Sequence, residues 1–255
     1  MIITLLTDFG TKDSFVGAMK GVILSLDPAA QIIDITHEIG PQDTGAAGFN
    51  LFACYRDFPR GTIHLSVVDP GVGSDRRAIL AVTDDYYFIA PDNGLLSFIY
   101  AAEPGIRVFE LNKDRFFRTP VSRTFHGRDV FAPVAGWLSK GALPEEMGDE
   151  ITDFVRFEIP KPVQITENKW QGEIVYIDRF GNCVTNLDKQ LLPESFHLEI
   201  NGRKITRLQK FYAEAEGKEP FMIFGSTGSL EISAFKDSAA NILNVETGEK
   251  VLARF

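Results

Sequence analysis

Short apolar runs alternate with segments of helical spacing through the N-terminal part of the chain. The runs predict buried strands, and the spacing of apolar residues between them predicts amphipathic helices. Strands are expected at 2–6, 32–35, 63–68, 78–82 and 86–90. Helices are expected at 15–24, with Asp13 as N-cap, at 44–55 and at 129–138. Strands that alternate with helices predict a mostly parallel α/β sheet.

The hydrophobic pattern changes near residue 160, where Pro160 and Pro162 indicate an extended linker. Beyond it the apolar runs are short and separated by turn residues, at 172–177, 184–187, 197–200 and 230–232. This pattern is typical of an all-β domain, with one helical piece expected around 208–215. We therefore expect an α/β domain over 1–158, a linker over 159–165 and a smaller β-rich domain over 166–255.

Composition narrows the class of protein. The 255 residues are 44% hydrophobic, which suffices for a real core, and the net charge of -9 argues against a nucleic-acid partner. Cys54 and Cys183 are too few for a disulfide framework. The N-terminus lacks a basic signal-peptide region, and no apolar run has the length of a membrane span. We expect a soluble cytoplasmic protein without a membrane partner.

The most informative segment follows the apolar run at 63–68. Asp69 ends the run, a Pro-Gly-x-Gly turn follows, and Arg76 comes next. Because the turn lacks a Gly-Lys-Ser/Thr ending, it is not a phosphate loop. Asp69 and Arg76 could form an ion pair that only stabilises the loop, or they could belong to a ligand site at a strand end.

A second glycine-punctuated segment carries His126, one of four histidines. None of the four pairs at metal-ligand spacing, so a zinc site is not expected. A single histidine is more often structural than catalytic. Together with Asp69 and Arg76, however, His126 indicates a site assembled from distant segments.

Further candidate residues could recognise a nucleoside. Asp8, after the first strand, is either a turn acid or a carboxylate that accepts from two neighbouring hydroxyls. Asp178, Phe180 and Asn182 occupy alternate positions, so they either form a hairpin turn or, in an extended chain, face a purine nucleoside together. The small-residue loop at 224–229 could offer backbone hydrogen bonds to a base.

These segments together resemble the S-adenosyl-L-methionine (SAM) hydrolases that form adenosine, also called SAM hydroxide adenosyltransferases. These enzymes are relatives of fluorinase and chlorinase. The resemblance covers essentially the whole chain. It is carried by TDFG at 7–10, PQD at 41–43, VDPGVG at 68–73, PDNG at 91–94, FHGRD at 125–129, DRFGNCVTN at 178–186, and GS at 225–226 with LE at 230–231.

The resemblance implies an N-terminal α/β domain, a C-terminal barrel-like β domain and a homotrimer. Its ligand would lie between the N-domain of one subunit and the C-domain of the next. Asp69, Arg76 and His126 would be the catalytic triad that acts on water. The halogenase branch carries an extra loop, which is not evident here, and lacks the pair found at Asp69 and Arg76.

The resemblance also implies the substrate contacts. Asp8 matches a carboxylate that binds the ribose diol. Methionine- and adenine-side contacts match Asp178, Phe180 and Asn182, and Ser226 matches a contact to the methionine end. Glu231, which belongs to the last of these motifs, is grouped with the substrate-binding residues.

The implied reaction is attack of water on ribose C5′ in line with the departing sulfur, which gives adenosine and L-methionine. Sulfur leaves as a neutral thioether, so we expect no general acid, cofactor or metal. Arg76 stays protonated and would stabilise the developing hydroxide. His126 is the favoured proton acceptor, and Asp69 as the base remains open.

Three alternatives remain. One is a chlorinase-like transfer of the adenosyl group to halide. The second is a module that binds adenosine or SAM without turnover. The third is a metal-dependent hydrolase that uses Asp8, Asp69 and His126.

Overall fold

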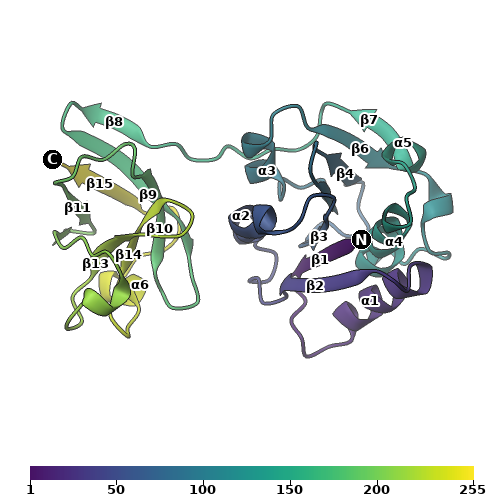
Figure 1. Ribbon diagram of the computed structural model, residues 1–255, viewed down its shortest axis with the longest axis horizontal. Coiled ribbons are helices and arrows are strands. Elements are labelled where there is room, and N and C mark those ends of the chain that lie inside the picture. The colour runs from purple at the N-terminus through teal and green to yellow at the C-terminus, as the bar shows by residue number, and fades with distance from the viewer. The chain divides into compact units, whose positions relative to one another are not determined.

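The computed structural model describes residues 1–255, which form two compact units, Met1–Glu158 and Ile159–Phe255 (Figure 1). The strands of the first unit are β1 (Ile2–Thr7), β2 (Gln31–Thr36), β3 (Ile63–Val67), β4 (Ala78–Val82), β5 (Tyr87–Pro91), β6 (Arg107–Leu111) and β7 (Gly148–Ile151). Its helices are α1 (Phe15–Leu26), α2 (Thr44–Cys54), α3 (Ser97–Ala102), α4 (Ala132–Ser139) and α5 (Pro144–Met147).

The seven strands form one sheet in the order β2-β1-β3-β5-β4-β6-β7. Neighbours from β2 to β5 run parallel, whereas β4 is antiparallel to β5 and β6, and β6 is antiparallel to β7. The expectation of a mostly parallel sheet was therefore wrong. The connection from β4 to β5 is too short for a crossover helix, so the chain must return in the opposite direction.

The helices begin and end close to the expected positions. Val16, Met19 and Ile23 of α1 are buried, as their three- and four-residue spacing predicts. The N-cap of α1 is Ser14 rather than Asp13, and Ser14 makes no side-chain cap hydrogen bond. By contrast, the Asp43 carboxylate accepts from the amide of Ala46 and caps α2. The helix expected at 129–138 begins as a π-helical turn, Gly127–Phe131, and continues as α4.

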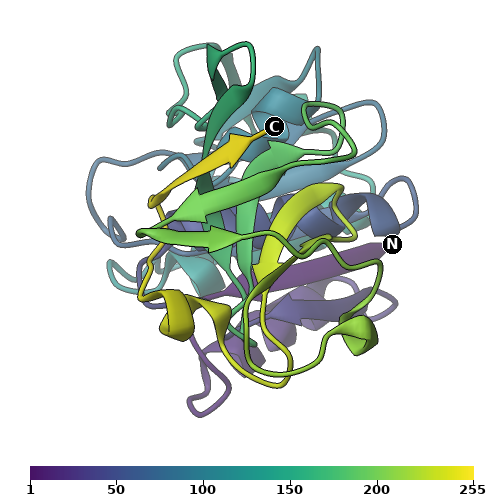
Figure 2. The ribbon, with the colours of Figure 1, turned by 90° about the vertical axis from the view of Figure 1, so that its left-hand side faces the viewer.

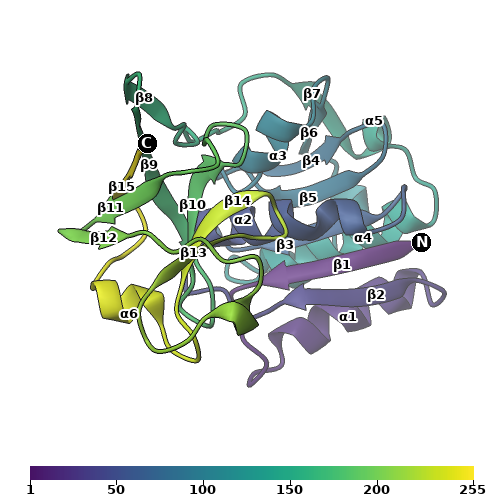
Figure 3. The same ribbon diagram turned by 60° about the vertical axis from the view of Figure 1, so that its left-hand side comes forward.

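Two apolar cores cover the two faces of this sheet. Helices α1 and α4 pack on the face that carries Leu5 and Leu65, and α2 with the segment before α3 packs on the face that carries Leu6 and Phe88. Adjacent residues Leu5 and Leu6 point to opposite faces because side chains alternate along a strand. The sheet therefore lies between two helical layers (Figures 1 and 3).

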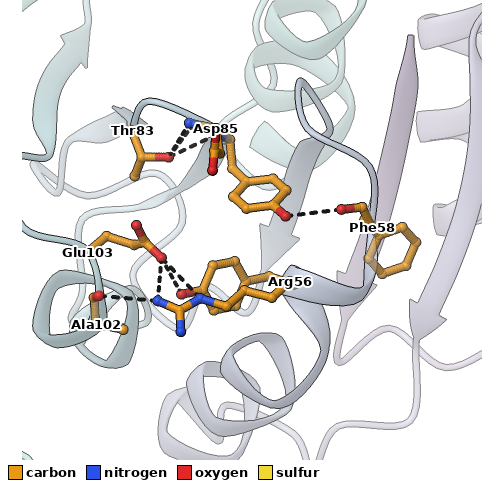
Figure 4. Close-up of polar contacts among 8 residues, drawn as sticks. Arg56, Phe58, Thr83, Asp85, Ala102 and Glu103 are labelled. Atoms are coloured by element: carbon orange, nitrogen blue, oxygen red, sulfur yellow. Dashed lines mark hydrogen bonds and ion pairs between the residues drawn. The ribbon is translucent and has the colours of Figure 1, made fainter.

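A polar network closes one side of the α2–α3 layer (Figure 4). The Tyr55 hydroxyl donates to Glu103 Oε1 at 2.5 Å, and Arg56 Nη2 donates to the same oxygen at 2.7 Å. This carboxylate joins the end of α2 to the end of α3. Tyr86 donates from its hydroxyl to the carbonyl of Phe58 at 3.0 Å.

His64 lies beside this network on β3 and is completely buried. Its ring stacks on Phe88 with centroids 5.2 Å apart, and Nδ1 shares a 2.8 Å hydrogen bond with the hydroxyl of Thr4. Burial lowers the pKa of His64 to about 3. His64 therefore serves the core as a neutral ring.

The second unit is all-β apart from one short helix, α6 (Ala239–Leu243). Its strands are β8 (Val163–Thr166), β9 (Lys169–Ile177), β10 (Cys183–Asp188), β11 (His197–Ile200), β12 (Arg203–Ile205), β13 (Phe221–Phe224), β14 (Ser229–Ser233) and β15 (Lys250–Arg254). They form a curved, barrel-like sheet in the order β12-β11-β15-β9-β10-β14-β13, with β8 paired to β9 (Figure 2). The predicted fold class is confirmed.

The helical piece expected around 208–215 is confirmed only in part. Only Tyr212–Glu214 forms a 3-10 turn, because Leu208 forms an isolated bridge to Met222 and holds the preceding chain extended. Both cysteines are free thiols. No helix in either unit has the length and apolar character needed to cross a membrane.

Candidate active site

The order of the strands in the first sheet changes direction at β1. From β1 the chain passes to β2 on one side, and from β2 it passes to β3 on the other side of β1. Such a change of direction is where open α/β sheets bind ligands. Thr7 and Val67 are register partners at the ends of these strands, so Asp8 and Asp69 follow at the same edge.

Asp69 and Arg76 are joined within the loop that follows β3. Arg76 Nε donates to Asp69 Oδ1 at 2.9 Å, and Arg76 Nη2 donates to Asp69 Oδ2. The two side chains are only 5% and 10% exposed, so water screens this pair far less than it screens a surface ion pair. The forked contact fixes the orientation of the guanidinium.

Gly73 allows this loop to approach the segment that leads to His126. Its φ of 79° lies in the left-handed region, and a Cβ atom there would sit 2.2 Å from the carbonyl oxygen of Arg123. No side chain fits such a gap. The glycine therefore brings together two loops that are distant in sequence.

Arg76 also donates from Nη2 to Nδ1 of His126 at 2.8 Å. A guanidinium has no acceptor, so Nδ1 must accept, and the hydrogen of the neutral imidazole lies on Nε2. Burial lowers the pKa of His126, and the positive charge of Arg76 lowers it further. The structure thus brings Asp69, Arg76 and His126 together as a chain with the arginine in the centre.

Aromatic rings lie beside Arg76 and beside the segment that carries His126. The guanidinium of Arg76 lies 5.2 Å from the ring centroid of Phe131, in the π-helical turn that follows His126. Such turns often mark functional sites. The Phe125 ring meets Phe9 at 6.1 Å between centroids, and Phe9 follows Asp8. The loops of Asp8 and His126 are therefore neighbours.

The Asp8 carboxylate is partly accessible. Its Oδ2 accepts from the amide of Gln42 at 2.9 Å. Behind it, the Thr7 hydroxyl shares a 2.9 Å hydrogen bond with Nδ1 of the buried His37 and accepts from the amide of Phe9. Asp8 is thus a turn acid in the structure and also has capacity for further hydrogen bonds.

The second unit contains its own cavity of about 670 Å³, a size suited to a small molecule. Asp178, Phe180 and Asn182 all contribute to its lining. Of the two arrangements expected for them, the structure shows the hairpin turn, between the antiparallel strands β9 and β10, and not the extended segment. The Asp178 carboxylate accepts from the amides of Phe180 and Asn182 and from Asn182 Nδ2, and these bonds bend the chain. The ring of Phe180 is 75% exposed.

Tyr212 also lines this cavity, although it was not among the residues predicted from the sequence. Its hydroxyl donates to Glu231 Oε2 at 3.0 Å, and burial raises the pKa of Glu231. Glu231 thus lies behind a residue of the cavity wall. Ser226 is exposed in the turn between β13 and β14. Tyr212 was hidden because its segment was expected to be a helix, although its aromatic ring with a polar end was a usable signal.

The predicted residues fall into two sets. Asp8, Asp69, Arg76 and His126 belong to the first unit, and Asp178, Phe180, Asn182, Ser226 and Glu231 belong to the second. No group of three or more His, Cys, Asp or Glu side chains is arranged to hold a metal ion. The structure therefore does not offer Asp8, Asp69 and His126 as a common donor set.

Comparison with known proteins covers both units. Residues 3–148 match the family model of the SAM hydroxide adenosyltransferase N-terminal domain, and residues 172–252 match that of the C-terminal domain. A protein of Thermus thermophilus named (R)-S-adenosyl-L-methionine hydrolase is 36% identical over 96% of this chain and 96% of its own length. One of Methanocaldococcus jannaschii with the same name is 38% identical over 96% of this chain and 92% of its own length.

More distant and structural relatives agree with these matches. A fluorinase of an Actinoplanes species is 28% identical over 74% of this chain and 72% of its own length. The crystal structure of an uncharacterized conserved protein from Thermotoga maritima superposes with a TM-score of 0.92, at 35% identity, over 100% of both chains.

Proposed function

Because the chain belongs to the SAM hydroxide adenosyltransferase family, we propose that it hydrolyses SAM to adenosine and L-methionine, with Asp69, Arg76 and His126 acting on the attacking water. The named hydrolases among its relatives support the activity. The observation that carries the residue assignment is the shielded chain of contacts from Asp69 through Arg76 to His126.

The leaving group of this reaction needs little assistance from the protein. The sulfonium departs from ribose C5′ as neutral L-methionine, so no proton must be supplied to sulfur. The protein must place one water in line with the breaking carbon–sulfur bond, and positioning of this kind can lower a barrier by about 7–11 kcal/mol. Negative charge develops on the water oxygen as its proton passes to a basic group of the protein, and Arg76 supplies a fixed positive charge for the hydroxide that forms.

The hydrogen-bond pattern favours Asp69 over His126 as the proton acceptor, in contrast to the first expectation. Nδ1 of His126 already accepts from Arg76, and the remaining ring nitrogen carries the hydrogen. His126 therefore donates to the water or hydroxide. Each oxygen of the Asp69 carboxylate retains a lone pair after it accepts from Arg76.

The remaining predicted residues are assigned to the substrate. Asp8 accepts from the ribose diol, Asp178 and Asn182 bind polar groups of the ligand, and Phe180 stacks on the adenine. Ser226 contacts the methionine end, and Glu231 orients Tyr212 in the cavity wall.

The proposal also includes assembly and location. In a homotrimer, the first unit of one subunit and the second unit of the next would together bind the substrate. We place this trimer in the cytoplasm. Molar mass in solution and cell fractionation test these two statements.

The direct test is incubation of the purified protein with SAM, with products separated by chromatography and identified by mass spectrometry. Adenosine and L-methionine in equal amounts are expected, with and without a chelator. A 5′-chloro nucleoside in chloride buffer would favour adenosyl transfer to halide. Tight binding of SAM without any product would favour the non-catalytic module, and loss of turnover with chelator would favour the metal-dependent alternative.

A further inference from the structure

The PDNG sequence at 91–94 has no role in the reaction described above. Its Asp92 and Asn93 side chains nevertheless both form hydrogen bonds within the first unit. Asp92 is buried and lies just after β5. Its Oδ1 accepts from the amide of Val155 at 2.8 Å, and its Oδ2 accepts from Arg77 Nε at 2.9 Å. Asp92 therefore joins Arg77 to the segment 153–157, the last part of the first unit.

Arg77 completes this connection from the other side. It donates from Nη1 to Asp153 Oδ1 at 2.7 Å and from Nη2 to the Asp153 carbonyl at 2.8 Å. The guanidinium thus bridges a buried carboxylate, 2% exposed, and an exposed one, 79% exposed. Water screens the contact with the buried Asp92 less than the contact with the exposed Asp153.

The segment 153–157 is fastened at two further points. The amide of Phe157 donates to the Ser97 hydroxyl at 2.9 Å. Gly94 has a φ of 93°, and a Cβ atom there would lie 3.0 Å from the Phe157 ring. Only glycine combines this backbone conformation with so close a neighbour. The segment is therefore seated on the residues that follow β5.

The same residues also hold the loop of the candidate active site. Asn93 Nδ2 donates to the carbonyl of Val68 at 2.9 Å, and the amide of Asp92 donates to the carbonyl of Arg77 at 2.9 Å. Val68 precedes Asp69, and Arg77 follows Arg76. Both ends of the loop that carries the Asp69–Arg76 pair are thus attached to Asp92 and Asn93.

We propose that Arg77, Asp92 and Asn93 are positioning residues that couple the segment 153–157 to the geometry of Asp69 and Arg76. This inference rests on the proposed function. None of the three side chains needs to touch the substrate, because they act through the backbone at the two ends of the loop. The segment they hold continues directly into Ile159 and the second unit, so movement of that connection is transmitted to the reacting groups.

The chain offers a matched control for this proposal. Arg107 also bridges two carboxylates of the first unit, Glu145 and Glu150, but none of these three residues contacts the loop of Asp69 and Arg76. Arg77→Ala and Arg107→Ala therefore remove the same kind of bridge. Only the first removes it next to the candidate active site.

Steady-state kinetics with SAM test the coupling. Arg77→Ala and Asn93→Ala are expected to lower kcat by about 10- to 100-fold with little change in KM, since small displacements of reacting groups have effects of this size. Arg107→Ala is expected to behave like the wild type. Arg77→Lys keeps the positive charge, but one ammonium cannot bridge both carboxylates in the same way. Its kcat should therefore lie between those of Arg77→Ala and the wild type.

Hydrogen exchange provides a readout that does not require turnover. Peptides covering 68–77 should exchange faster in Arg77→Ala than in the wild type or in Arg107→Ala, while peptides covering β1 remain protected. If the wild type does not hydrolyse SAM, the proposed function fails, and the exchange experiment still tests the coupling. Should Arg77→Ala fold poorly, Asp153→Ala removes the exposed carboxylate of the bridge and leaves Asp92 in place. Unchanged kcat together with unchanged exchange at 68–77 in folded variants would overturn the inference.

Discussion

The candidate groups of the two units differ in how they are held. In the first unit, Asp69 and Arg76 are almost completely shielded, and Arg76 donates hydrogen bonds to both Asp69 and His126. In the second unit, Phe180 is exposed at the wall of an open cavity. The first arrangement is fixed before a ligand arrives, as groups that act on a transition state need to be. The second leaves surface free for a ligand to cover. We therefore expect changes in the first unit to affect kcat and changes in the second to affect KM.

The largest effect is expected from Arg76→Ala. It removes the charge beside the attacking water and leaves the buried Asp69 without its partner, so kcat should fall by about 10²–10³-fold. KM for SAM should change little. Steady-state kinetics measure both constants. Arg56→Ala, which removes an arginine from the network in Figure 4, is the control and should retain the wild-type kcat. A loss confined to KM would contradict the comparison.

A smaller effect, on KM rather than on kcat, is expected from Phe180→Ala. Stacking of a base on an aromatic ring contributes about 1–3 kcal/mol, so KM should rise by roughly 5- to 150-fold while kcat stays near the wild-type value. Phe211→Ala removes another exposed aromatic ring of the same unit and serves as control. If Phe180→Ala instead lowered kcat alone, the division of roles between the units would be wrong.

Acid should destabilise the first unit through His64. Its folded-state pKa of about 3 lies below the ordinary value, so the unfolded chain binds a proton first as the pH falls. Stability is fully present above about pH 6.5 and is lost below it, at about 1.4 kcal/mol per pH unit until the folded pKa is reached. Urea unfolding at several pH values measures this slope. His64→Phe should flatten it, whereas His197→Phe in the second unit should not.

The smallest effect is a displaced titration of His126. Its pKa is lowered by burial and by Arg76, so an NMR titration should place it below the ordinary histidine value. Protonation at Nδ1 would break the bond from Arg76, and kcat should therefore fall on the acid side of this pKa. In Arg76→Gln the positive charge is absent, and the pKa of His126 should rise. A pKa that does not respond to this substitution would contradict the contact.

Much of the fold was predictable because strands and helices of the first unit have strong periodic patterns. The strand at 78–82 was placed correctly, and Asp69 emerges from a strand as expected. The strand directions were not predictable from periodicity, because antiparallel β4 and β6 are as apolar as the parallel strands beside them. In the second unit, Asp178 folds its segment into a turn through side-chain bonds that a period-two pattern does not reveal.

The residues of the site could be predicted from the sequence, but the order of the contacts between them could not. The spacing of Asp69 and Arg76 suggested a pair, whereas the order of contacts, with Arg76 between Asp69 and His126, comes only from the folded loops. That order is the reason why we propose Asp69 rather than His126 as the proton acceptor. The function of Asn93 was invisible in the sequence because its partner is a backbone carbonyl, which every residue has.

The close approach at Gly73 limits which sequences this loop can have. If position 73 were randomised and variants were selected for turnover, glycine alone should survive, although the residue contributes no chemical group. The restriction would come from the backbone carbonyl of Arg123, whose own side chain is exposed. A residue of one loop can thus be restricted to glycine by the backbone position of another loop.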